Sequence, residues 1–581
     1  MGLIWQLNWF FKQYWRRYGV AIVILAIVAI IQTRVPALIG SMIDTIVHSS
    51  REEVWSDFQP QLYQLLFIGV LVYILRYIWR VALYGAAYRL GHILRQKLYQ
   101  HYLNMDATFF QEQRAGKLIA HVTNDIQAVE MTAGEGILTL VDSMMIGCLV
   151  LAIMTTHYSW QLTLISLLPL PIMAFLVARI GRQIHSGFTE AQAAFSEVNN
   201  VAHENISGIR TVRLFAAEHY AQEMMQQTAE SASQANMKVA GADAKFDPVI
   251  YLCIGCAYLF TLSGGSWLIH EKILTIGELT SFSLYLGQLI WPMFAIAWLF
   301  NILERGSAAY HRIQNVLNMQ AEIHSGTNRT PIIQPSIQIE QLSFAIDKRA
   351  ILTDVNFTIS PGHFIGIVGP TGSGKTTLLR LLQRFIEASH GLITINGTSL
   401  PEFDLATLRQ CFAYVPQDPY LFSMSVAGNL KIGAPQASQT QLEWATKLAD
   451  IHEDIIRLPN GYDTQVGERG ITLSGGQKQR LSIARALLSQ KPVLLLDDAL
   501  SAVDSKTAHQ ILNNLSRQSL TTVMISHRLQ GLESASQILV LDRGKIREQG
   551  SHQTLLDAHD WYAKTWLYQQ IEQALDEEAN D

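Results

Sequence analysis

The stretch "FIGIVGPTGSGKTTLLRLL", Phe364 to Leu382, decides the fold of the second half of the chain. An apolar run leads into G-x-x-x-x-G-K-T and then into a helical pattern, which is the strand–loop–helix setting of a phosphate-binding loop. Backbone N–H groups and the helix N-terminus hold phosphates there, the lysine neutralises the outer phosphates, and the last hydroxyl ligates Mg²⁺. The sequence therefore predicts ATP and Mg²⁺ as cofactors, held by Gly369, Pro370, Thr371, Gly372, Ser373, Gly374, Lys375 and Thr376.

A second acidic stretch, "VLLLDDALSAVD" from Val493 to Asp504, completes this predicted site. A buried strand that ends in Asp497 brings a carboxylate to the same Mg²⁺. The next residue is Asp498, where the longer Glu is expected if a water molecule is to hydrolyse ATP. A carboxylate drawn back by roughly 1 Å can slow such a reaction by about 10²-fold.

A second Gly-rich stretch, "LSGGQ", begins the helical pattern "KQRLSIARALL". Its backbone N–H groups form another anion cradle at a helix start. One chain holds one triphosphate, so the extra cradle favours a head-to-tail pair in which each cradle closes over the nucleotide of the opposite chain. A simple Gly-rich turn is the alternative. The cradle consists of Leu473, Ser474, Gly475, Gly476 and Gln477.

The first half of the chain is predicted to cross a membrane. Hydrophobic residues make up 49% of the 581 residues and charged residues only 16%, and the apolar ones concentrate before about residue 305. A transmembrane helix needs roughly 20 mostly apolar residues. Six segments qualify, at about 19–42, 61–85, 135–157, 160–178, 249–270 and 276–302.

The distribution of charge predicts how the membrane spans are oriented, and the composition predicts the domain boundaries. Lys12, Arg16 and Arg17 precede the first segment and Arg179 and Arg182 follow the fourth, which places both termini and both long connections in the cytoplasm. The net charge of -5 gives no indication of a nucleic-acid partner. The predicted divisions are an interfacial helix at 1–18, a transmembrane domain at 19–318, a linker at 319–336 and a nucleotide-binding domain at 337–575.

Charged residues inside the predicted spans are candidates for a water-filled cavity, because they are costly in a bilayer. They are Arg34, Arg76, Arg80 and Asp142. Arg76 and Arg80 also fit the cytoplasmic edge of the membrane, and the role of Asp142 stays open.

With these motifs, nearly the whole chain resembles the ATP-binding cassette (ABC) transporters, as one half of an exporter. Gln417 in "YVPQDPYLF" is similar to the Q-loop, Asp504 in "SAVD" to the dimer-contacting D-loop, and His527 in "ISHRL" to the switch histidine. The resemblance implies a helical membrane domain of six spans with long cytoplasmic extensions, followed by an α/β ATPase domain. It implies catalytic roles for Asp498, His527 and Gln417, and Mg²⁺ ligation by Thr376, Gln417 and Asp497.

Other stretches extend the resemblance into the membrane half. "FFQEQRAGKLIAHVTNDI" and "ENISGIRTVRLFAAE" look like the cytoplasmic extensions that carry coupling helices. "GEGILTLVDSMMIG" and "NILERGSAAYHRI" are similar to half-transporters of a bacterial multidrug-type exporter. The implied partners are a second half-transporter, a lipid bilayer (the bacterial cytoplasmic membrane) and amphipathic small-molecule substrates.

Two positions depart from the family pattern, and both concern the nucleotide held by this chain's own loop. Asp498 stands in the place of a catalytic Glu, and Ile346 stands where an aromatic ring usually stacks on adenine. The signature, which serves the partner's nucleotide, is intact. We therefore expect a heterodimer in which this chain's site is slow. The alternatives are a homodimer in which Asp498 suffices, a lipid or peptide exporter of the same build, and a nucleotide-gated regulatory subunit without pumping.

Overall fold

The structure is a computed structural model that describes residues 2–48, 54–347, 349–467, 470, 472–518 and 520–580. The chain divides into two compact units. The first contains Met1–Leu103 and Ala115–Met319, and the second contains Asn104–Arg114 and Gln320–Asp581. A short piece of the N-terminal half thus belongs to the C-terminal unit.

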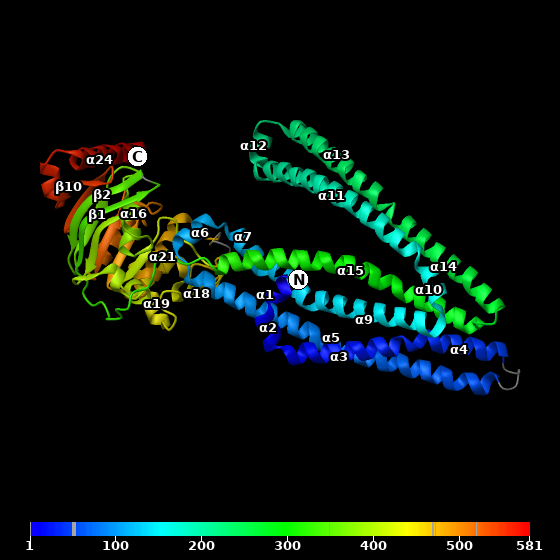
Figure 1. The fold of residues 1–581 in the computed structure, drawn as a ribbon. Coiled ribbons are helices and arrows are strands. Elements are labelled where there is room, and N and C mark those ends of the chain that lie inside the picture. Colours follow the sequence, from blue (N-terminus) through cyan, green and yellow to red (C-terminus); the bar gives the residue numbers. More distant parts are fainter. Residues whose placement is uncertain are drawn as a thin grey trace. The chain divides into compact units, whose positions relative to one another are not determined.

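The first unit is entirely helical in its described part (Figure 1). Its elements are α1 (Gly2–Gln6), α2 (Asn8–Gln13), α3 (Trp15–Gln32), α4 (Arg34–His48), α5 (Val54–Asn104), α7 (Ala115–Ala120), η1 (His121–Asp125), α8 (Ile126–Met131), η2 (Thr132–Gly136), α9 (Ile137–Ile153), η3 (Met154–Ser159), α10 (Trp160–Leu167), α11 (Pro169–Ser207), α12 (Ile209–Leu214), α13 (Glu218–Asp243), α14 (Phe246–His270) and α15 (Ile276–Leu317).

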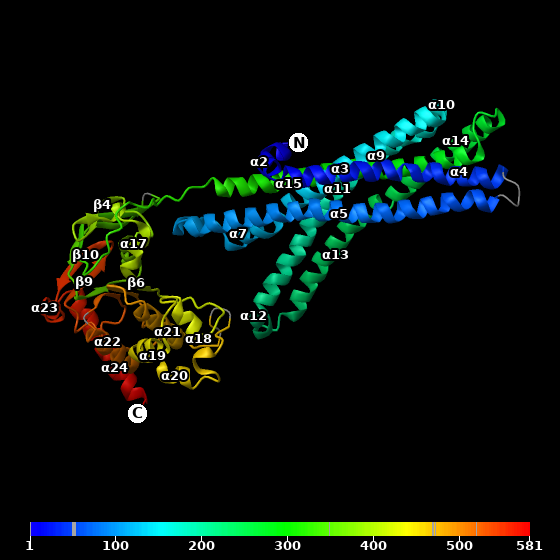
Figure 2. The same cartoon turned by 90° about the horizontal axis from the view of Figure 1, so that it is seen from below.

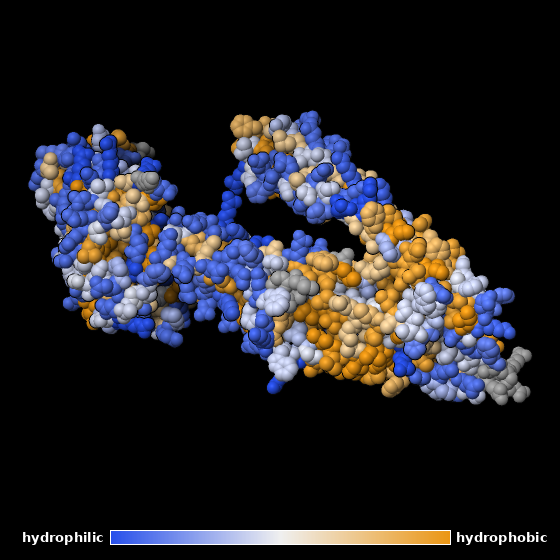
Figure 3. Space-filling model, in the orientation of Figure 1, coloured by the Kyte–Doolittle hydropathy of each residue, from blue (hydrophilic) through white to orange (hydrophobic). Residues whose placement is uncertain are grey.

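The predicted spans all lie within these helices. Within the residues that the structure describes, five helical stretches are long and apolar enough to cross a membrane, and the third runs over Ala115–Ser207. Ser159 divides that stretch, because its backbone is extended (φ -152°, ψ 123°) and its hydroxyl accepts a hydrogen bond from the N–H of Leu162. The chain reverses at this point, so the stretch contains two of the six predicted spans (Figure 1). Apolar side chains accordingly cover much of the visible surface of these helices (Figure 3).

The start of the chain differs from the single interfacial helix that the sequence predicts. Leu7 leaves the helical conformation (φ -86°, ψ 7°) and separates α1 from α2. Leu3, Leu7 and Phe10 are almost fully buried. These three residues are spaced i, i+4 and i+7, so they share one face of the helical path despite the break.

A close crossing joins α4 to the start of α15. A Cβ atom added at Gly277 would lie 2.0 Å from the carbonyl oxygen of Gly40, so only glycine fits. Asp44 accepts hydrogen bonds from the Thr275 hydroxyl (2.6 Å) and the Gly277 N–H (2.8 Å). Thr275 and Glu278 add a capping box, so the N-terminal N–H groups of α15 are well satisfied.

Two of the helices form an arm with few partners inside the chain. α11 and α13 run side by side and diverge from α5 and α15 towards α12 (Figures 1 and 2). The only buried residue of the described α13 is Ala232. At the tip of the arm, Leu214 is 84% exposed and Phe215 79% exposed. This surface is more apolar than a solvated tip needs to be.

The second unit is an α/β fold. Its elements are α6 (Ala107–Glu112), β1 (Ile337–Ile346), β2 (Arg349–Ile359), β3 (Phe364–Val368), α16 (Lys375–Leu382), β4 (His390–Ile395), β5 (Thr398–Ser399), η4 (Leu400–Glu402), α17 (Leu405–Gln410), β6 (Phe412–Val415), α18 (Val426–Lys431), α19 (Gln439–Leu448), α20 (His452–Ile456), η5 (Gly461–Asp463), α21 (Gly475–Leu488), β7 (Val493–Asp497), α22 (Ser505–Ser516), β8 (Thr521–Ile525), β9 (Gln537–Asp542), β10 (Lys545–Gly550), α23 (His552–Asp557) and α24 (Trp561–Asn580).

The strands of this unit form two sheets. An antiparallel sheet has the order β2-β1-β4-β5, and a larger sheet has the order β10-β9-β3-β8-β7-β6. In the larger sheet β9, β3, β8, β7 and β6 are parallel and β10 is antiparallel. β7 and β8 are buried along their whole length, as expected of parallel strands covered on both faces. Ligands of such sheets bind beyond the carboxyl ends of the strands, which is where the candidate residues lie.

The predicted linker is hydrogen-bonded to the second unit. Gly326 N–H donates to Phe403 O, Asn328 N–H donates to Glu402 O, and both distances are 2.9 Å. Asp106, just before α6, accepts hydrogen bonds from Phe109 N–H (3.1 Å) and from Glu322 N–H (2.7 Å). One carboxylate thus holds the start of α6 and the first residues after α15 together.

Candidate nucleotide site

The loop between β3 and α16 has the backbone that its glycines predict. Gly369 (φ 146°) and Gly374 (φ 101°) lie in the region that favours glycine. A Cβ atom at Gly369 would lie 2.0 Å from the Leu541 carbonyl oxygen, and one at Gly374 would lie 2.7 Å from the Leu352 side chain. Only glycine therefore fits these two positions of the loop.

Lys375 opens α16 and is only 6% exposed. Its Nζ donates to the carbonyl oxygens of Gly369 and Pro370, both at 2.9 Å. Burial lowers the pKa of Lys375, although the charges of Asp498 and Asp497 oppose that shift. The ammonium group is thus held by its own loop in the place where it would meet phosphate oxygens.

Asp497 ends β7 and faces the same loop. Its Oδ1 accepts from the Thr376 hydroxyl at 3.0 Å, and its Oδ2 accepts from the Tyr414 hydroxyl at 3.0 Å. Burial raises the pKa of Asp497, and these two hydrogen bonds oppose the rise. A hydroxyl and a carboxylate so close together are oxygen ligands of the kind that Mg²⁺ prefers.

Asp498 follows in the left-handed conformation (φ 49°), and its N–H donates to Ile525 O at 3.0 Å. The side chain is 9% exposed. Its Oδ2 accepts from Gln417 Nε2 at 3.3 Å. Two residues that the sequence assigns to hydrolysis therefore meet, with the shorter carboxylate held by the amide.

A cavity of about 640 Å³ unites these groups. Ser373 Oγ is buried there and has no hydrogen-bond partner in the described structure. Its hydroxyl is therefore free to donate a hydrogen bond to a phosphate oxygen. The loop, Lys375 and the Thr376–Asp497 pair thus fit ATP with Mg²⁺. The predicted site residues that line the cavity are Thr371, Gly372, Ser373, Gly374, Lys375, Thr376, Gln417, Asp497, Asp498 and His527.

Ile346 does not line this cavity in the described structure and remains a prediction for the adenine contact. It is 52% exposed at the end of β1, opposite Arg349. Across the hairpin, Arg349, Ala350 and Ile351 line the cavity instead. These residues carry no motif, so the sequence alone did not indicate them.

His527 lines the cavity on a loop that a C-terminal side chain holds. Gln569 of α24 donates from Nε2 to His527 O at 2.9 Å and accepts from Leu529 N–H at 2.8 Å. Arg528 donates to Val503 O at 3.2 Å, which ties the same loop to the "SAVD" segment. Sequence reasoning missed Gln569, because nothing local in "LYQQIEQ" marks a contact 42 residues away.

The signature lies elsewhere in the unit. Ser474 caps α21 and forms a capping box with Gln477. The five signature residues, all within the described part of the chain, do not line the cavity. Asp504 caps α22, and the hydrogen bond from Thr507 N–H lowers the pKa of this exposed carboxyl. Neither element reaches the chain's own loop, as expected if both face another chain.

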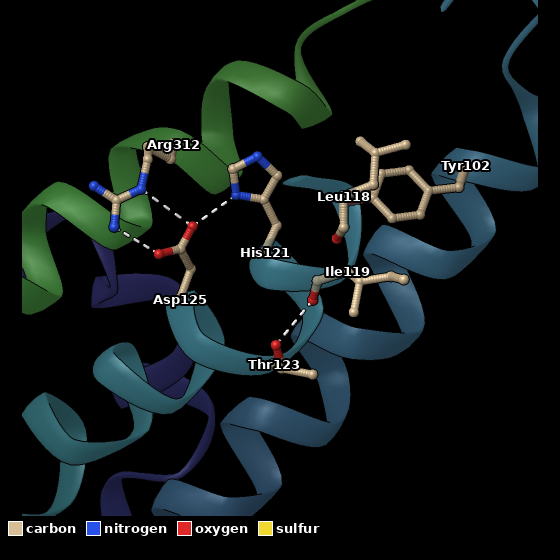
Figure 4. A network of polar contacts seen from close by, with 7 residues as sticks. All are labelled: Tyr102, Leu118, Ile119, His121, Thr123, Asp125 and Arg312. Carbon is tan, nitrogen blue, oxygen red and sulfur yellow. Dashed lines mark hydrogen bonds and ion pairs between the residues drawn. The ribbon is translucent and has the colours of Figure 1, made fainter. Parts of the chain in front are cut away.

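A separate polar network lies in the first unit, between η1 and α15 (Figure 4). Asp125 accepts from His121 Nδ1 at 2.6 Å and from Arg312 at 3.1 and 2.5 Å. Burial alone would raise the pKa of Asp125, but the hydrogen bonds from Arg312 and His121 outweigh it and lower the pKa. The network ties η1 to the last turns of α15.

Comparisons with known proteins match both halves of the chain. A family model described as the ABC transporter transmembrane region matches residues 18–293, and one described as ABC transporter matches residues 352–501. The multidrug resistance-like ATP-binding protein MdlA of Escherichia coli (strain K12) is 45% identical over 99% of this chain and 98% of its own length. The ATP-dependent lipid A-core flippase of Legionella pneumophila (strain Paris) is 34% identical over 82% of each chain. The structure of a bacterial Atm1-family ABC exporter with ATP bound matches with a TM-score of 0.77 at 25% identity, over 95% of this chain and 99% of that one.

Proposed function

Because the chain belongs to the ABC transporter family as an exporter half-transporter of the multidrug-resistance-like type, we propose that it exports amphipathic drugs and xenobiotics from a bacterial cell. It is an ATPase whose activity is coupled to transport. It acts in the cytoplasmic membrane as a multi-pass protein with both termini in the cytoplasm. The membrane unit spans the lipid bilayer, and the second unit supplies the energy.

The arm of α11, α12 and α13 supports assembly with a second half-transporter. Its tip exposes Leu214 and Phe215 almost completely, and α13 buries almost nothing inside the chain. Large apolar side chains left exposed in this way favour a protein partner. The signature and Asp504 do not line the chain's own nucleotide cavity. They would therefore act on a nucleotide that a second chain holds.

The pairing of Asp498 with Gln417 is the single observation that carries the finer proposal. The carboxylate lies 3.3 Å from the Gln417 amide. Its side chain is one methylene shorter than that of Glu, so it would reach less far towards an attacking water. The signature "LSGGQ" is intact. The chain therefore works as the slower half of a heterodimer with an MdlB-like second half-transporter, to whose nucleotide it lends its signature.

The residues of the site then have distinct tasks. Bound MgATP supplies the phosphoanhydride whose hydrolysis drives the cycle. When MgATP is bound, Lys375 would neutralise phosphate charge, and Thr376, Gln417 and Asp497 would hold the metal. His527 and Gln417 line the same cavity and would contact the outer phosphate, while the short Asp498 would orient water poorly.

Export of a lipid by a homodimer is the second candidate, and the lipid A-core flippase at 34% identity is the observation that favours it. A peptide exporter or a nucleotide-gated regulatory subunit without a pumping stroke has no comparable support.

Reconstitution in inside-out vesicles tests the proposal. The full chain, purified together with the half-transporter it pairs with, is expected to accumulate an amphipathic dye only when MgATP is present, and the Lys375→Ala variant is expected to weaken this uptake. Purification of a homodimer that hydrolyses ATP rapidly and moves labelled lipid but no dye would refute it.

A further inference from the structure

A cavity of about 570 Å³ lies within the first unit and is separate from the nucleotide site. Every lining residue falls in one of the predicted spans 19–42, 61–85, 135–157 and 276–302. A volume in this range holds a drug-sized molecule. The lining residues come from α3, α5, η2, α9 and α15.

The cavity carries charges of both signs from different elements. Arg76 and Arg80 are four residues apart on α5 and so share one face of that helix. Glu135 comes from η2 and Asp142 from α9. The basic groups and the acidic groups therefore enter the cavity from separate helices, and their formal charges cancel.

These charges do not neutralise one another directly. Within the described residues, no ion pair joins any two of the four side chains, although the charges of Arg76 and Asp142 are close enough to interact. Arg80 lies over the ring of Trp79 at 5.6 Å, and Glu135 accepts from Trp298 Nε1 at 3.3 Å. Unpaired charges at membrane depth are costly and mark functional pathways.

Flat apolar surface completes the cavity. Trp291 and Trp298 lie seven residues apart on α15, and they are 66% and 52% exposed. Leu25 and Val28 of α3 add aliphatic surface. Indole rings bind planar aromatic groups and also attract cations.

From this set we propose that the cavity binds zwitterionic aromatic amphipaths, with the cationic end towards Glu135 and Asp142 and the anionic end towards Arg76 and Arg80. This inference rests on the proposed export function and names its substrate class. A ligand with only a positive charge would leave the two arginines without a partner. A purely anionic ligand would leave the two carboxylates without one, so only a dipolar ligand compensates both sets.

A matched dye series tests the charge preference. The probes are the zwitterionic free acid of a rhodamine, its cationic methyl ester, and dianionic fluorescein, which share one xanthene scaffold. Binding is measured by dye anisotropy on the full chain with its paired subunit in lipid nanodiscs, without ATP. The zwitterion is expected to bind about tenfold tighter than either other dye, which corresponds to one charged hydrogen bond.

Two neutralising variants should act in opposite directions. Asp142→Asn is expected to weaken the binding of the zwitterion and of the cation about tenfold and to leave the binding of the dianion unchanged. Arg76→Gln is expected to weaken the binding of the zwitterion and of the dianion and to leave the binding of the cation unchanged. Thr139→Val, which changes the same cavity without changing charge, keeps the wild-type order of affinities. Equal losses for all three dyes in both variants, or no preference for the zwitterion in the wild type, would overturn the inference.

Failure of the wider function gives a different result. If ATP drives the uptake of neutral or cationic amphipaths and neither Asp142→Asn nor Arg76→Gln changes the dye order, export stands and the charge preference is wrong. If no amphipath accumulates with ATP while the anisotropy pattern holds, the cavity binds as inferred and the export function is wrong.

Discussion

Replacing Asp498 by Glu is expected to accelerate ATP hydrolysis at this chain's own site. Asp498 is 9% exposed, and its Oδ2 lies 3.3 Å from Gln417 Nε2 in the cavity that Lys375 and His527 also line. Glutamate has one further C–C bond, which lengthens the side chain by roughly 1.5 Å. The carboxylate would then extend past the amide towards the space that water must occupy.

The size of the effect follows from that displacement. A misplacement of about 1 Å at a reacting group can cost about 10²-fold in rate, which equals about 2.7 kcal/mol in the activation barrier. We therefore expect Asp498→Glu to raise the turnover of the chain assembled with itself by about 10- to 100-fold. In a heterodimer whose partner site already hydrolyses ATP, the same change adds only one further working site and raises the total far less.

Phosphate release from the purified chain in nanodiscs, at saturating MgATP, measures this change. Asp498→Asn serves as a matched variant, because it keeps the side-chain length and removes the charge, and we expect it to stay about as slow as the wild type. Adding Lys375→Ala to Asp498→Glu should remove the gained activity.

Two results would refute the reasoning. One is a wild-type chain that, without any partner, already hydrolyses ATP as quickly as Asp498→Glu. The other is an Asp498→Glu chain that binds ATP normally yet gains nothing, since the missing methylene would then not be what limits the site.

Gln569→Ala should lower the maximal ATPase rate several-fold with little change in the KM for ATP, because the loop of His527 loses a hydrogen bond to its backbone. Gln570→Ala, the neighbouring control, should leave the rate unchanged. An equal fall of the rate in both variants would contradict this. Asp125→Asn should lower stability by about 1–3 kcal/mol at neutral pH. The folded pKa of Asp125 lies below its unfolded value, so its contribution is present at neutral pH and is lost as pH falls through the folded pKa, and unfolding temperatures of variant and wild type should converge in acid. Gly277→Ala places a Cβ atom against a carbonyl oxygen and should lower the free energy of unfolding by about 1–3 kcal/mol, measured as a lower unfolding temperature in detergent. An unchanged unfolding temperature would mean that α4 and α15 can move apart at no cost.

Much of the fold was predictable because its signals are local. A span needs only a run of apolar residues, and a phosphate loop needs only its glycines, lysine and hydroxyl between a strand and a helix. The membrane domain followed by an α/β ATPase domain is accordingly confirmed. The break at Leu7 was not predicted, because no glycine or proline stands at or next to that position in the sequence.

The site was predictable to the extent that it consists of motifs. Lys375, Asp497 and Asp498 meet at one cavity because parallel strands end at the same edge of the sheet. Tyr414 and Gln569 were missed because their roles come from contacts across the fold and not from spacing. The roles assigned to the motif residues, and the adenine contact of Ile346, remain predictions.

The hydrogen bonds of Asp106 have a mechanical consequence. The chain passes between its units after Leu103, after Arg114 and after Met319. Asp106 lies just past the first passage and grips Glu322, just past the third. One carboxylate inside the second unit therefore ties the segment that follows α5 to the segment that follows α15, and we expect Asp106→Asn to let these two segments separate more easily.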